Sequence, residues 1–75
     1  MEEKILELLA EIDEGILSYD GDDLFEAGLL DSFQVIELVE MLEENFDREI
    51  DAEHVVAENF ATKEAILELM RRLLA

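Results

Sequence analysis

The chain has 75 residues, and its 22 acidic and 5 basic side chains give a formal net charge of −17 at pH 7. A chain of this length is expected to form a single domain over residues 1–75. Its charge makes nucleic acid an unfavourable partner and favours a basic surface on another protein. Cysteine is absent, which excludes disulfides, thiolate metal sites and a thiol nucleophile of the protein's own.

The first predicted helix runs from Glu2 to Glu14, where apolar residues recur at helical spacing between acidic ones, namely Ile5, Leu8, Leu9 and Ile12. Gly15 is expected to end this helix as a C-terminal glycine. Residues Ile16 to Leu30 are expected to form a long ordered loop, because serine, aspartate and glycine are dense there. Within this loop, Leu24 to Ala27 are compatible with one helical turn.

The second helix is expected to begin after Asp31 and to run to about Phe46. Asp31 and Gln34 have the spacing of a capping box, in which each side chain accepts a hydrogen bond from the other residue's backbone N–H. Its buried stripe consists of Val35, Leu38, Val39, Leu42 and Phe46. On the pattern alone the other side is a solvated face, which holds Glu37, Glu40, Glu43 and Glu44.

A short third helix is expected from about Glu53 to Glu58, with Asp51 as its N-cap. The apolar residues at its ends, which would anchor it in the core, are Ile50, Val55 or Val56, and Phe60. It is too short to persist without packing against the other helices.

The last helix is expected to start after Thr62 as its N-cap, with Arg71 and Arg72 near its negative C-terminal end. Its core side repeats at helical spacing through Ile66, Leu69, Met70 and Leu73. The predicted fold is therefore all-α: a small four-helix bundle with three main helices, one short helix and a long loop between the first and second helices.

The acidic loop between the first two helices does not match an EF-hand. After Asp20 and Asp22 the alternating ligand position holds Leu24, and the required glycine position holds Phe25. Such a loop cannot wrap one calcium ion in the usual way. No specific metal site is expected, although weak surface binding of divalent ions is compatible with the charge.

Ser32 follows a turn signal at Gly28 and stands at the start of the second helix, with its hydroxyl expected to be exposed and fixed in direction. Taken singly, a serine there is a common capping residue. A catalytic serine would need a nearby base and an oriented third group, and His54 is the chain's one histidine. No Gly-x-Ser-x-Gly turn surrounds Ser32 either. No catalytic residue is expected, and the protein is not expected to be an enzyme.

The surroundings of Ser32 form a longer pattern: GLLDSF at residues 28–33, IELV at 36–39, LEE at 42–44 and Phe46, on a small acidic helical chain. In this combination the sequence resembles the acyl carrier protein family, which includes peptidyl and D-alanyl carrier proteins. The resemblance covers nearly the whole chain. It implies a four-helix bundle of acyl-carrier type.

The resemblance implies that Ser32 receives a covalent phosphopantetheine group from coenzyme A, transferred by a separate magnesium-dependent phosphopantetheinyl transferase. The carrier then holds an acyl or aminoacyl group as a thioester and shuttles it between partner enzymes. Asp31 would help to present the serine. A helix N-terminus suits the phosphodiester, because backbone N–H groups and the helix dipole favour an anion there.

The same resemblance implies a partner surface on the second helix, formed by Phe33, Ile36, Glu37 and Glu40 and extended by Glu43 and Glu44. Exposed apolar Phe33 and Ile36 would be the contact anchors. Its partners would be the transferase and the acyl- or aminoacyl-activating ligases or synthases, which present basic docking surfaces. A monomeric carrier in fatty acid or lipid biosynthesis, peptidyl transfer or D-alanyl transfer is implied.

Two resemblances leave the cargo open. Residues Asp23 to Phe33 look most like D-alanyl carriers, whereas Ile50 to Ile66 look more like general acyl carriers. Glu40 stands where fatty-acid carriers often have methionine. The alternative to any carrier is an unmodified acidic helical adaptor that binds a basic protein through the second helix. The two differ at Ser32, since only the carrier needs a hydroxyl there.

The start of the chain gives an expectation about location. Residues Met1 to Lys4 lack the basic start and the unbroken apolar run of a signal peptide. No apolar stretch is long enough to form a transmembrane segment. A cytoplasmic protein is therefore expected.

Overall fold

Helix α1 (Glu2–Ile12) ends at Ile12 and not at Glu14. In the computed structural model, which describes residues 1–75, Asp13 is extended, and its Oδ1 accepts a hydrogen bond from Gly15 N–H at 2.8 Å. Gly15 does not end α1 but begins the short helix α2 (Gly15–Ser18). The prediction for Gly15 is therefore wrong, because an aspartate side chain that bonds to the backbone two residues later turns the chain first.

The segment between α1 and the next long helix differs from the predicted loop in its first part. It opens with α2, which buries Ile16 completely. Ala27 N–H donates to Asp23 O at 3.1 Å, so the expected single turn forms around Leu24. Gly28 has a φ of +77°, a conformation that side chains disfavour, and this confirms the turn predicted there.

Helix α3 (Ser32–Phe46) has the predicted bounds. In its predicted buried stripe, Val35, Leu38 and Leu42 are buried. Val39 and Phe46 are half-buried. The helix ends at Asp47, which adopts the left-handed conformation with a φ of 51°. Glu43 Oε2 then accepts a hydrogen bond from Ile50 N–H at 2.8 Å, so that this side chain fastens the following segment to α3.

The predicted third helix is wrong as a single element. The structure has a 3₁₀ helix η1 (Ala52–His54) and a separate short helix α4 (Ala57–Phe60). Val55 leaves the helical region and Val56 is extended, which suits two adjacent β-branched residues. The Asn59 side-chain amide donates to His54 O at 2.9 Å across this break. Asp51 makes no side-chain capping bond.

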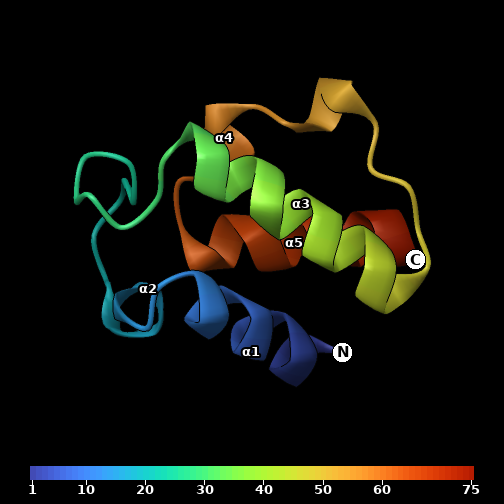
Figure 1. The fold of residues 1–75 in the computed structure, drawn as a ribbon, viewed down its shortest axis with the longest axis horizontal. Helices are drawn as coiled ribbons and strands as arrows, with labels where there is room; N and C mark the ends of the chain where they lie inside the picture. The colour runs from blue at the N-terminus through green and yellow to red at the C-terminus, as the bar shows by residue number, and fades with distance from the viewer.

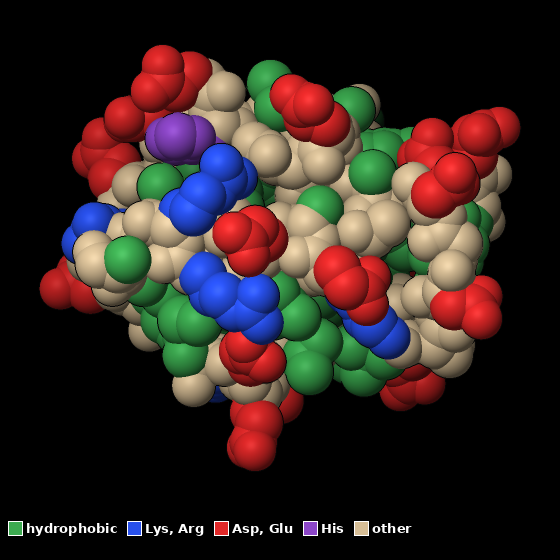
Figure 2. Space-filling view, turned by 180° about the vertical axis from the view of Figure 1, so that it is seen from behind, with side chains coloured by type: hydrophobic (Ala, Val, Ile, Leu, Met, Phe, Trp, Pro, Cys, Tyr) green, Lys and Arg blue, Asp and Glu red, His purple; other side chains and the backbone are tan.

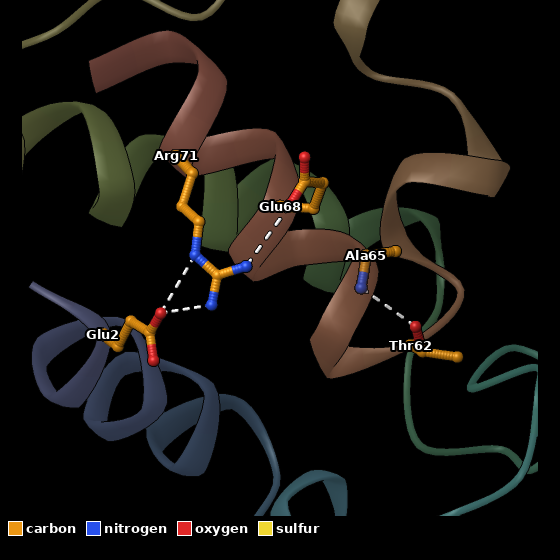
Figure 3. A network of polar contacts seen from close by, with 5 residues as sticks. All are labelled: Glu2, Thr62, Ala65, Glu68 and Arg71. Atoms are coloured by element: carbon orange, nitrogen blue, oxygen red, sulfur yellow. Dashed lines mark hydrogen bonds and ion pairs between the residues drawn. The ribbon is translucent and has the colours of Figure 1, made fainter. Parts of the chain in front are cut away.

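Helix α5 (Lys63–Leu74) starts as predicted, because Thr62 Oγ1 accepts a hydrogen bond from Ala65 N–H at 3.0 Å. Arg71 reaches from its last turn to Glu2 at the start of α1 and also bonds to Glu68 (Figure 3). The hydrogen bond and negative charge of Glu2 raise the pKa of the Arg71 guanidinium above its ordinary value. This exposed pair links the two terminal helices but contributes little stability.

The long helices α1, α3 and α5 surround one apolar core, and α1 packs against both of the others (Figure 1). Both chain ends lie on the same side of the molecule (Figure 1). The core contains no buried polar residue and consists of Ile5, Leu8, Leu9, Ile16, Leu24, Leu30, Val35, Leu38, Leu42, Ile50, Phe60, Ile66, Leu69 and Met70. The predicted all-α bundle is confirmed, with three short helices, α2, η1 and α4, in place of the one expected.

The basic side chains are concentrated away from α3. Three of the five lie on α5, and the reverse face of the molecule shows Lys and Arg side chains close together among acidic ones (Figure 2). Helix α3 has no basic residue, so its exposed charges are all negative. None of the helices combines the length and apolar character needed to span a membrane.

Candidate functional site

Ser32 is the first residue of α3, and Asp31 fixes the position of this helix start. Asp31 Oδ1 accepts a hydrogen bond from Gln34 N–H, and Gln34 Oε1 accepts one from Asp31 N–H, both at 2.9 Å. The predicted capping box is therefore confirmed. Because Asp31 is the cap, the exposed Ser32 hydroxyl is not needed to hold the helix start. It is available for chemistry in a fixed place.

The first turn of α3 offers an environment suited to an anion bound to Ser32. The first backbone bond within the helix is from Val35 N–H to Asp31 O, at 2.9 Å, so the N–H groups of Ser32 and Phe33 have no partner in the helix. These donors lie at the positive end of the helix dipole. A phosphate ester on Ser32 Oγ would sit beside them.

An apolar groove of about 310 Å³ opens beside Ser32. Apart from Ser32, its lining is entirely hydrophobic and comes from the turn before α3, from α3 itself and from the segment around α4: Phe25, Val35, Ile36, Val55, Val56, Ala57 and Phe60. It contains no titratable side chain that could act as a base on Ser32. It can take up a slender, largely apolar chain that starts at the serine.

The sequence did not reveal this groove. The pattern predicts Val35, Phe60 and either Val55 or Val56 as core residues. In the structure Val35 and Phe60 are buried, Val55 is half-buried, Val56 is exposed, and all four line the groove. The break at Val55 and Val56 turns an irregular backbone segment toward α3, and no periodicity predicts that. One feature of the sequence could have indicated the groove. Two adjacent valines, Val55 and Val56, lie between polar stretches, and such a pair is unusual in a surface loop.

The residues expected to contact a partner lie on one side of α3, next to Ser32. Phe33 is 85% exposed and Ile36 is 58% exposed, unusual values for large apolar side chains. Glu37 and Glu40 are also exposed and lie on the same helical face, because Glu37 follows Phe33 by four residues and Glu40 follows Ile36 by four. The structure therefore brings an apolar pair and two carboxylates together beside the serine.

The two remaining glutamates of the predicted surface differ from each other. Glu44 is exposed. Glu43 is half-buried and its carboxylate already accepts the Ile50 N–H, which gives it a structural duty at the far end of α3. Glu43 is consequently less available to a partner than Glu37 or Glu40.

His54 lies on η1, outside the lining of the groove. Its ring nitrogen Nε2 is 3.9 Å from Glu53 Oε1, and one donor atom each of Asp51, Glu53 and His54 lie within 4.8 Å of one another. The sequence predicts no metal site at these residues. Asp51 and Glu53 are exposed and His54 is half-buried, and no buried polar residue completes the cluster.

Asp31→Ala is expected to lower the free energy of unfolding by about 1 kcal/mol, because Gln34 N–H loses its capping acceptor. Urea denaturation followed by circular dichroism measures the change. Asp22→Ala is the matched control: this exposed loop aspartate should change stability by less than about 0.5 kcal/mol. Equal effects of the two substitutions would contradict the capping role of Asp31.

The structure is a small all-α bundle of acyl-carrier type, with an exposed serine at a helix start beside an apolar groove. In agreement, residues 3–70 match a protein family described as "Phosphopantetheine attachment site". The match spans most of the chain, and the chain belongs to this family. The family carries a covalently attached phosphopantetheine group, and the protein is accordingly a phosphopantetheine carrier protein.

Proposed function

We propose that phosphopantetheine is attached to Ser32 and that the protein carries an acyl or aminoacyl group as a thioester on this arm between partner enzymes. The observation that supports the site best is the Ser32 hydroxyl itself, exposed at the first residue of a helix that Asp31 caps. The free N–H donors of the first turn suit the phosphodiester. The groove beside Ser32 suits the apolar parts of the arm or its cargo.

The proposal gives the protein no catalytic step of its own. No titratable side chain lines the groove next to Ser32, and in the proposal a separate transferase supplies the base for attachment from coenzyme A. The thiol that bears the cargo belongs to the arm. Because the chain has no cysteine, no protein thiol competes for the thioester.

The proposed docking surface comprises Phe33, Ile36, Glu37 and Glu40, with Glu44 at its edge. Phe33 and Ile36 would enter apolar depressions of the partner, and the glutamates would pair with basic residues around its active-site entrance. The absence of any basic residue from α3 supports this choice of face. The partners would be the transferase and acyl- or aminoacyl-activating ligases or synthases.

The cargo belongs to the acyl and aminoacyl class, and D-alanyl and fatty-acyl groups are its two candidate members. The proposal describes a single-domain, monomeric carrier in the cytoplasm, where coenzyme A is present. The net charge of −17 supports the monomer, because it opposes association between copies of the chain.

Incubation of the purified protein with coenzyme A, Mg²⁺ and a broad-specificity phosphopantetheinyl transferase tests the proposal. Intact-mass spectrometry should show the addition of a single phosphopantetheinyl group, because one serine is exposed at a capped helix start. The alternative, an unmodified adaptor that binds a basic protein through α3, predicts no change of mass. An unchanged mass for the folded protein would therefore refute the carrier function.

A further inference from the structure

The hydroxyl of Tyr19 closes a small ring of hydrogen bonds in the loop that leads to Ser32. Tyr19 Oη donates to Asp23 O at 3.0 Å and accepts from Asp23 N–H at 2.9 Å. One side-chain group thus satisfies both backbone polar groups of a single residue in a segment without regular structure. The contact fixes the position of Asp23 relative to the end of α2.

Gly21 makes this ring possible. A Cβ atom at position 21 would lie 2.4 Å from Tyr19 Oη and 2.5 Å from Cζ, far closer than van der Waals contact. Gly21 does not have a positive φ, so its backbone would accept alanine. The glycine is therefore needed for the space that the Tyr19 ring occupies.

The Asp23 side chain connects the Tyr19 hydrogen bonds to the turn that lines the groove. Its Oδ1 accepts hydrogen bonds from Phe25 N–H at 2.9 Å and from Glu26 N–H at 3.4 Å. The next residue, Leu24, is fully buried, and its N–H donates to Ala61 O at 2.7 Å, which fastens the turn to the segment between α4 and α5. Phe25 is thereby held where it lines the groove beside Ser32.

We propose that Tyr19 is a positioning residue for the modification of Ser32. Its hydroxyl orders the loop around Asp23 and so holds Phe25, one wall of the groove at the serine, in the form that the transferase meets. Asp31 sets the direction of Ser32 independently of Tyr19, through its own capping bonds. Loss of the Tyr19 hydroxyl should therefore weaken docking and leave the chemical step unchanged. The role in modification rests on the proposed function of Ser32; the ordering of the loop does not.

Tyr19→Phe keeps the ring and removes the hydroxyl. Hydrogen exchange of the Asp23, Phe25 and Glu26 amides should become about tenfold faster, because two hydrogen bonds of the loop are lost. With the transferase, the KM for the carrier should rise about fivefold at unchanged kcat, since docking must now order the loop. Gly21→Ala should have the same effects, because the new Cβ displaces the Tyr19 ring.

The matched control is Ile5→Val in α1, a core change that lowers stability and lies outside the Tyr19–Asp23 hydrogen bonds. It should leave KM at the wild-type value, which separates positioning from a general loss of stability.

Unchanged amide exchange in Tyr19→Phe would overturn the ordering of the loop, and an equal rise of KM in Ile5→Val would overturn the positioning role. A wild-type protein that gains no group would refute the proposed function and with it the role of Tyr19 in modification. A modified wild type with unchanged KM in Tyr19→Phe would refute the role of Tyr19 alone.

Discussion

Ser32→Ala is expected to abolish phosphopantetheinylation completely, because the substitution removes the only oxygen that the proposed phosphodiester can use. The fold should persist. Asp31 caps α3, and the exposed Ser32 side chain is not part of the cap, so the free energy of unfolding should change by less than about 0.5 kcal/mol. Intact mass after incubation with coenzyme A and the transferase measures modification, and circular dichroism with urea denaturation measures the fold.

The chain provides its own control in Ser18, its other serine. Ser18 is also exposed, but it lies at the end of α2, where its hydroxyl donates to Gly15 O at 3.3 Å. Ser18→Ala should be modified to the same extent as the wild type. Modification that persists in Ser32→Ala, or that disappears in Ser18→Ala, would show that the attachment site is elsewhere.

The position of Ser32 at a capped helix start could be predicted because it depends on local chemistry. Asp31 and Gln34 are three residues apart, and the capping box they form uses only atoms of that first turn. Thr62 and the start of α5 follow the same logic. The buried faces of the long helices could also be predicted, because apolar residues recur at helical spacing over several turns of each.

The missed features depend on side chains that bond to the backbone where the sequence has no period. Asp13 ends α1 ahead of Gly15, and Glu43 reaches Ile50 across a left-handed turn at Asp47. An acidic residue in such a chain is indistinguishable by pattern from the many that are merely solvated. Whether such an acidic side chain bonds to the backbone depends on where the chain turns. That position is set by the packing of the chain against the rest of the core.

The groove beside Ser32 was missed for a related reason. Its walls come from three segments, of which the one around α4 is distant in the sequence from the other two. The part of that segment around Val55 and Val56 is expected from the sequence to be helical. A continuous helix there would place successive side chains around its axis, whereas the observed break directs Val55, Val56 and Ala57 into one lining. Short helices gain most of their stability from packing, so local sequence predicts them poorly.

The second large effect is expected from reversing charges on the docking surface. Glu37→Lys combined with Glu40→Lys should lower kcat/KM of the transferase for the carrier by about tenfold or more at low salt, because complementary charge speeds and orients the encounter. Both glutamates are exposed and belong to the α3 face that lacks any basic residue. The substitutions should therefore leave the fold intact, as measured by circular dichroism.

Two controls test whether the loss of kcat/KM comes from the α3 surface or from the change of net charge alone. One is a double variant on α1, and the other is the dependence on salt. Glu3→Lys combined with Glu7→Lys alters two exposed glutamates of α1 and changes the net charge by the same amount. This control should retain most of the wild-type kcat/KM. Raising ionic strength to about 0.5 M shortens the screening length to about 4 Å, and should slow the wild type far more than the Glu37/Glu40 variant. Equal losses in the two double variants, or equal responses to salt, would mean that α3 attracts its partner no more than any other acidic face does.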